Sequence, residues 1–183
     1  MHSNPAPIFI NYLKQLENML VKIETHCSGQ ADILHSSLQK DMLPFIAQVR
    51  TAINFSLRTC CPLVGRERFS FDSEPTFAGL REQLLETLRY LEALTDVDFE
   101  KAPLRIQDKA GFNDLDLTCD EYVSLYALPN FFFHLSMSYA IARQAGIPLS
   151  KADFDGYHSY PVGFSFVELM YYLSKINCLR FYP

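Results

Sequence analysis

The sequence contains no run of lysine and arginine residues, and this absence limits the classes of partner. Its 183 residues carry 16 basic and 21 acidic side chains, for a formal net charge of -5 at pH 7. A nucleic-acid surface needs concentrated positive charge to neutralise phosphate groups, whereas the basic residues here are scattered among acids. We therefore expect no nucleic acid among the partners of this protein.

The sequence also has no segment typical of export or of a membrane span. Residues 1–7 are polar and contain proline, in place of the basic and apolar segments of a signal peptide. The apolar stretch around Phe131 includes Asn130, His134 and Arg143, which favours a buried helix over a membrane span. Five cysteines without CxxC spacing indicate a reducing compartment and no disulfide framework. We expect a cytoplasmic protein without a membrane anchor.

Apolar residues recur at helical spacing in four long segments, which predicts an all-α domain over residues 1–183. We expect the first helix to begin at Pro5 to Pro7 and stop near Gly29, and the second to begin between Ser37 and Pro44 and end before Pro62. We expect the third to be capped by Asp72 or Ser73 and to end near Leu94, and the fourth to open at Thr118 or Asp120 and end at Gly146. Together they predict a four-helix bundle.

Two irregularities are expected around the fourth helix. Before it, the pairs Leu104/Ile106 and Leu115/Leu117 alternate with polar residues, which predicts a small β-hairpin turning at Gly111. Inside it, Pro129 lacks a backbone N–H, so we expect a kink just before Asn130.

The segment after Gly156 differs from the rest of the chain. Residues 157–163 have the composition of a loop, and Ser165 and Glu168 then have the spacing of a capping box before a very apolar stretch. We predict a short C-terminal helix, from Ser165 to about Asn177, that docks on its own bundle or on a second subunit.

Apolar side chains outside the main helical faces predict association. The first helix carries Ile8, Leu13 and Val21 away from its apolar stripe, and the tail adds Met170 and Tyr172. Contiguous apolar surface normally marks an interface, so we predict a homodimer.

The fourth segment combines an apolar sequence with a polar stripe. Tyr126, Asn130, His134 and Ser138 recur every fourth residue, and residues at this spacing share one face of a helix. Polar groups inside an apolar interior need partners, because burying them without hydrogen bonds is costly. These four residues are the candidate site.

Four helices with a long third connection, ending in ARQAGIP, resemble the DinB/YfiT-like superfamily of metalloenzymes. The runs DMLPFIAQVRTA and ALPNFFFHLSMSYAIARQAGIPLSKADFDG are similar to an uncharacterised bacterial branch of it, defined as a domain of unknown function. The resemblance covers residues 5 to 156 and leaves residues 157–183 outside. It implies a four-helix bundle and, in members with metal, three histidines around a divalent ion. One comes from the second helix, and two come from an HxxxH pair in the fourth.

The residues at these three positions depart from the family pattern. Aligned on ARQAGIP, the HxxxH pair falls on Asn130 and His134, and the second-helix position falls near Gln48. His134 is then the only ligand position that is retained. Amide oxygens are weak ligands for zinc or nickel, so we expect no tightly bound metal cofactor and a polar network in its place.

Two functions follow from this pattern. The first is a non-catalytic bundle that binds a small molecule or a partner through a pocket formed by Gln48, Tyr126, Asn130, His134 and Ser138. For His134, three roles remain open: a core histidine that is hydrogen-bonded to its neighbours, a residue that lines the pocket, or a general base. The alternative is a DinB-like metal-dependent enzyme, either a hydrolase or a thiol-linked transferase, with a weakly bound divalent metal ion.

Overall fold

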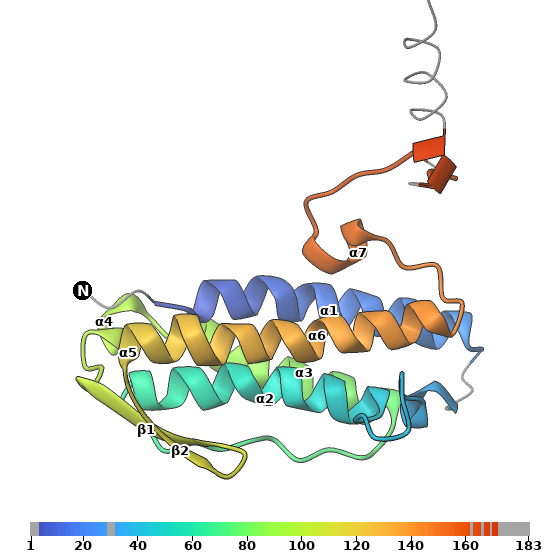
Figure 1. Ribbon diagram of the computed structural model, residues 1–183. Helices are drawn as coiled ribbons and strands as arrows, with labels where there is room; N and C mark the ends of the chain where they lie inside the picture. The colour runs from blue at the N-terminus through green and yellow to red at the C-terminus, as the bar shows by residue number, and fades with distance from the viewer. Residues whose placement is uncertain (1–3, 29–31, 162, 166, 169, 172–183) are drawn as a thin grey trace, which may run out of the picture.

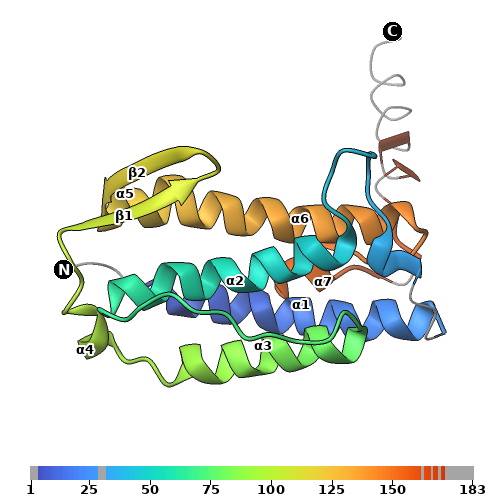
Figure 2. The same ribbon diagram turned by 90° about the horizontal axis from the view of Figure 1, so that it is seen from below.

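Four long helices lie side by side in the computed structural model, which describes residues 4–28, 32–161, 163–165, 167, 168, 170 and 171 (Figure 1). They are α1 (Ala6–His26), α2 (Phe45–Leu63), α3 (Phe77–Glu92) and α6 (Leu128–Gln144). α1 and α6 run in one direction and α2 and α3 in the other (Figures 1 and 2). The closest helix pairs are α2 with α6 and α1 with α3, so each close pair is antiparallel. The predicted all-α bundle is confirmed.

The shorter elements fill the connections between these helices. A 3₁₀ turn, η1 (Asp32–His35), precedes α2, and one helical turn, α4 (Asp96–Phe99), follows α3. The connection 64–76 runs back along the bundle, which allows α2 and α3 to be parallel (Figure 2).

Two predicted helix ends are corrected by the structure. Thr76, not Asp72 or Ser73, caps α3, and its hydroxyl accepts a hydrogen bond of 3.0 Å from the backbone N–H of Gly79. α2 does not end before Pro62 but includes it in its last turn. A proline there leaves the carbonyl of Arg58 without its helical donor, and the Tyr122 hydroxyl lies 3.5 Å from that oxygen. At this distance the hydroxyl is at most a weak donor to the carbonyl, because its single proton is directed at Asp108, 2.6 Å away.

The core is formed by the facing stripes of the four helices. Phe9 of α1 meets Phe131 of α6 edge to face, with ring centroids 4.9 Å apart. Leu13, which we placed on the outer face of α1, is fully buried, because it completes the inner stripe of that helix. Ile8 and Val21 are exposed as expected. The homodimer stays a prediction.

The fourth helix is continuous but not uniform. Thr118 and Glu121 form a capping box at α5 (Cys119–Glu121), a π-helical segment, η2 (Tyr122–Ala127), follows, and α6 then begins. Pro129 lies in the first turn of α6. The π-helical segment just before Pro129 is a widened turn, a form in which a helix can continue past an irregular position. The kink before Asn130 stays a prediction. No helix among the described residues has both the length and the apolar composition to cross a bilayer.

The predicted hairpin is present. β1 (Arg105–Ala110) pairs antiparallel with β2 (Asn113–Thr118), and Ala110 faces Asn113 across a two-residue turn. Gly111 occupies the first turn position with φ of +61°, a conformation that favours glycine.

A half-buried ionic cluster holds the hairpin on the bundle. Asp108 of β1 accepts two hydrogen bonds of 2.8 Å from the guanidinium of Arg58 on α2, and one of 2.6 Å from the Tyr122 hydroxyl on η2. Burial opposes ionisation of Asp108, but the hydrogen bonds from Arg58 and Tyr122 outweigh it and lower the pKa of this carboxyl below its ordinary value. One carboxylate thereby joins three elements of the fold.

The segment after α6 contains one helix that the sequence did not suggest, α7 (Lys151–Asp155). Ser150 and Asp153 form its capping box, and Gly156 ends it with φ of +75°. The predicted C-terminal helix falls largely outside the described residues. Of its apolar side chains, those of Val167, Met170 and Tyr171 are described, and they are exposed in the single chain. The docking of this helix stays a prediction.

We predict that Asp108→Ala lowers the free energy of unfolding by about 2 to 3 kcal/mol, because it leaves Arg58 and Tyr122 unpaired around a partly buried site. Asp114→Ala, on the other strand of the same hairpin, should cost less than about 0.5 kcal/mol, since Asp114 faces Lys109 in open solvent. Urea denaturation followed by circular dichroism measures both variants. Equal effects would contradict the anchoring role of Asp108.

The same cluster has a pH dependence with a defined sign. The pKa of Asp108 is lowered in the folded protein, so its contribution is full above the ordinary carboxyl range and declines as pH falls through the lowered pKa. The stability difference between the wild type and Asp108→Asn should therefore shrink below about pH 4.

Candidate functional site

A hydrogen bond between α2 and α6 defines the centre of the candidate site. The Nδ1 atom of His134 lies 2.7 Å from Oε1 of Gln48, and Gln48 is almost completely buried. Nε2 of Gln48 donates to the carbonyl of Leu43 at 3.3 Å, which directs its oxygen toward the imidazole. His134 therefore carries its proton on Nδ1 and keeps a lone pair on Nε2.

The environment of His134 favours the neutral imidazole. Its ring stacks on Phe55 with centroids 5.8 Å apart, and the ring of Phe133 meets its edge at 5.2 Å. Burial in these apolar surroundings lowers the pKa of His134 below its ordinary value.

The other members of the polar stripe bond locally. Asn130 donates from its side-chain amide to the Tyr126 carbonyl at 2.7 Å, one helical turn back. The Ser138 hydroxyl, fully buried, donates to the carbonyl of Leu135 at 2.8 Å. The hydroxyl of Tyr126 reaches the carbonyl of Lys109 in the hairpin at 3.2 Å. The structure thus joins Gln48 to His134, and it does not bring the five predicted residues together in one hydrogen-bonded set.

The side-chain chemistry at this position does not fit a transition-metal site. Of the three ligand positions of the superfamily, Gln48 and Asn130 offer amides, and both amides are engaged in hydrogen bonds. Zinc and nickel sites in proteins use imidazole, thiolate or carboxylate donors. Within the described ranges, no group of three or more histidine, cysteine, aspartate or glutamate side chains is placed to hold an ion.

An open groove lies on the other side of Phe55. Its volume is about 410 Å³, and we call it the Phe55 groove; it is lined by Thr51, Asn54, Phe55 and Arg58 of α2 and by Arg68, Phe69 and Ser70 of the connection 64–76. Arg58 lies over the rings of Phe55 and Tyr126, at 5.3 and 5.6 Å from their centroids. Arg68 donates to the carbonyl of Gln107 at 2.9 Å and lies 3.8 Å from Asp108.

The sequence pattern did not reveal this groove. Arg58 and Phe55 lie three residues apart on α2, which is a signal for a shared face, but Arg68 and Asp108 come from a loop and a strand distant in sequence. Two guanidinium groups against a single buried carboxylate leave the groove with an excess positive charge. That charge suits an anionic group at the mouth of the groove.

Comparisons with known proteins identify the family. The model of the DUF1993 family, a domain of unknown function, matches residues 1–155. Among solved structures, the chain is similar to a DinB family member protein from Shewanella denitrificans, with 30% sequence identity, a TM-score of 0.74, and coverage of 86% of this chain and 92% of that one. The curated proteins contain no match. This chain belongs to the DUF1993 family and has a DinB-like fold, which confirms the resemblance found in the sequence.

We predict that His134 titrates below pH 6.5 and has its proton on Nδ1 when neutral, because burial disfavours the imidazolium and Gln48 accepts from Nδ1. Two-dimensional ¹H–¹⁵N NMR of the histidine ring distinguishes the tautomers and gives the pKa. In Gln48→Leu the tautomer preference should be lost. A proton on Nε2 in the wild type, or a pKa above 6.5, would contradict the geometry of this pair.

Proposed function

We propose that this protein is a non-catalytic small-ligand-binding bundle that takes a small anionic molecule in the Phe55 groove and carries no resident transition metal. The 2.7 Å hydrogen bond between Gln48 and His134 supports the absence of a resident metal, and the guanidinium groups of Arg58 and Arg68 support an anionic ligand in the groove. The Gln48–His134 bond pairs two of the three ligand positions. His134 is the one histidine of the superfamily pattern that this chain retains, and Gln48 is a neutral side chain at the second-helix position.

The electrostatics of the site support a binding role. Neutral His134 and the two amides supply hydrogen bonds but no negative charge to attract a cation. The Phe55 groove, by contrast, combines the guanidinium groups of Arg58 and Arg68 with the amide of Asn54. An anion is therefore favoured there and a divalent cation is disfavoured.

The shape of the groove indicates the remainder of the ligand. Phe69 provides an exposed ring surface, the largely buried Phe55 contributes a smaller part of the wall, and Ser70 and Thr51 provide hydroxyl groups beside them. Apolar walls with a few convergent polar groups are typical of small-molecule sites. We infer that the ligand carries a carboxylate on a flat, apolar body.

Phe55 links the groove to the polar stripe. The same ring lines the groove and stacks on His134, so a molecule pressing on Phe55 alters the surroundings of the imidazole without touching it. His134 is then a reporter of ligand binding as well as a core residue.

The metal part of the proposal is tested by restoring the pattern of the superfamily. The double variant Gln48→His/Asn130→His places three imidazoles at the three ligand positions, and it should bind zinc about 100-fold more tightly than the wild type. Isothermal titration calorimetry with zinc, on protein prepared without a histidine tag, gives both affinities.

The wild type is the matched control in this titration. Stoichiometric zinc in wild-type protein, bound as tightly as in the double variant and lost in His134→Ala, would overturn the proposal. That result would favour the metal-dependent enzyme.

The ligand part is tested with benzoate, a flat carboxylate. We expect saturable binding with a Kd on the order of 1 mM, as for a fragment of this size, and a shift of the His134 ring resonances on titration. Arg68→Gln should weaken binding about tenfold, whereas Arg66→Gln, two residues away and in contact with Tyr90, should not. Benzylamine, which has the same ring and the opposite charge, should not bind. Equal loss in both arginine variants, or equal binding of benzylamine, would contradict an anionic ligand at this groove.

A further inference from the structure

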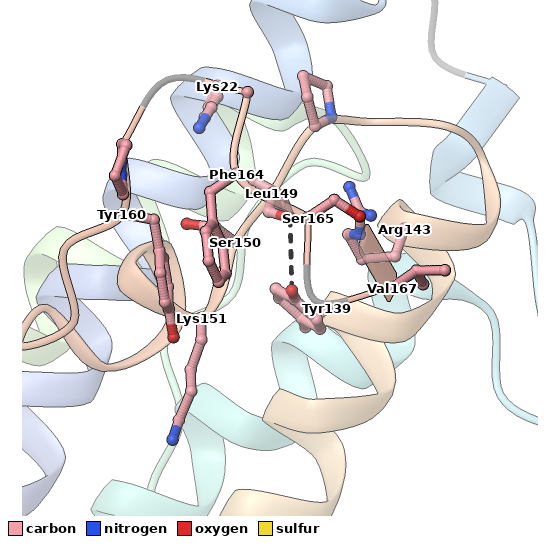
Figure 3. Close-up of a pocket in the computed structure, with 13 residues that line it drawn as sticks. Lys22, Tyr139, Arg143, Leu149, Ser150, Lys151, Tyr160, Phe164, Ser165 and Val167 are labelled. Carbon is pink, nitrogen blue, oxygen red and sulfur yellow. Dashed lines mark hydrogen bonds between the residues drawn. The ribbon is translucent and has the colours of Figure 1, made fainter. Parts of the chain in front are cut away.

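A second and larger pocket lies at the opposite end of α6, away from the Phe55 groove. Its volume is about 890 Å³, and we call it the tail pocket. Its walls come from α1, the end of α6, the turn before α7 and the segment after α7 (Figure 3); they comprise Lys22, Tyr139, Arg143, Pro148, Leu149, Ser150, Lys151, Tyr160, Pro161, Gly163, Phe164, Ser165 and Val167. Residues 160–167 lie beyond the family match at 1–155, so this wall is a feature of the extension.

The segment that forms the outer wall is held to the end of α7. Asp155, at the end of α7, accepts hydrogen bonds from the backbone N–H groups of Tyr157 and His158 at 2.9 and 3.1 Å, and its other oxygen lies 2.5 Å from the imidazole of His158. The ring of His158 stacks on Tyr160, and Tyr160 stacks on Phe164 with centroids 5.1 Å apart. This series of contacts places aromatic rings over the turn at Leu149 and Ser150 (Figure 3).

The charged side chains that line the tail pocket have one sign. Three cationic side chains line it, and none of its described lining residues is acidic. Lys22 is paired with Asp153 of α7 at 3.0 Å, and Lys151 extends away from the aromatic wall in Figure 3. Arg143 donates one N–H group to the carbonyl of Ile147, at 3.0 Å, and among the described residues no further hydrogen bond occupies its guanidinium.

The remaining surface of the pocket is apolar. Leu149, Phe164 and Val167 line it, and the Tyr139 ring lies below them with its hydroxyl 3.4 Å from the carbonyl of Leu149 (Figure 3). Phe164 and Val167 are exposed to solvent, with 38% and 78% of their surfaces accessible. An apolar chain lying against them would remove this surface from water, and that removal favours binding.

We propose that the tail pocket binds a single-chain amphiphile with a carboxylate head, with Arg143 holding the carboxylate and the apolar residues holding the chain. A fork of N–H groups matches the two oxygens of a carboxylate, which an isolated lysine does not. The site is independent of the Phe55 groove, because the two pockets share no lining residue.

Isothermal titration calorimetry with three probes separates the contributions of head and chain. Decanoate should bind with one site per chain. Acetate, which has the head without the chain, and decyltrimethylammonium, which has the chain with a cationic head, should both bind at least about tenfold more weakly. Equal binding of decanoate and decyltrimethylammonium would show a non-specific apolar surface and overturn the proposal.

Variants locate the site on the chain. Arg143→Gln should weaken decanoate binding about tenfold, and Arg68→Gln, in the other groove, should leave it unchanged. Val167→Asp provides a second test that does not disturb packing, since Val167 is exposed, and its added carboxylate should repel decanoate. The reciprocal experiment separates the two proposals: Arg143→Gln should keep its affinity for benzoate. Decanoate binding that is unchanged in both Arg143→Gln and Val167→Asp would place the ligand elsewhere and refute the assignment.

Discussion

The hydrogen bond between Gln48 and His134 joins α2 and α6, the two most closely packed helices of the bundle. α6 is apolar along most of its sequence, and His134 is half-buried where it meets α2. A polar group withdrawn from water needs a hydrogen-bond partner, and Gln48 supplies one to His134 as a neutral side chain. Because the amide oxygen can only accept, the pairing favours the proton of His134 on Nδ1, and burial of the ring lowers the pKa of the imidazole. Two positions that hold metal-ligating residues in the superfamily are here occupied by side chains that connect α2 and α6.

A second polar contact fixes the opposite part of α2. Asp108 brings the hairpin to Arg58 and Tyr122, accepting hydrogen bonds from both side chains. Because Arg58 is held in this way, its guanidinium stays over Phe55 at the edge of the groove. The same contacts that stabilise the hairpin therefore orient the charge that a ligand would meet.

The periodicity of the sequence was sufficient to predict the four helices and the hairpin, because each depends on local spacing of apolar residues. Helix ends were less predictable: Asp72, Ser73 and Thr76 are all suitable capping residues, and only the structure shows that Thr76 caps α3 and that α2 includes Pro62 in its last turn. The Gln48–His134 pair followed from the family resemblance and the i, i+4 stripe. The Phe55 groove could not be predicted in this way, because Arg68 and Asp108 belong to a loop and a strand that only the tertiary fold brings together. Leu13 was misplaced for a related reason. The spacing of apolar residues alone does not distinguish a helix with a wide buried face from a helix with a second, exposed apolar patch, and Leu13 is buried.

The central claim is that neutral hydrogen bonding replaces metal coordination at the superfamily position. Crystals of wild-type protein soaked in zinc and measured at the zinc absorption edge test it most directly. The account predicts no anomalous density within bonding distance of Nε2 of His134, and continued contact between Nδ1 and Gln48. An anomalous peak about 2.0 to 2.1 Å from Nε2, with Asn130 and Gln48 turned toward it, would contradict the account.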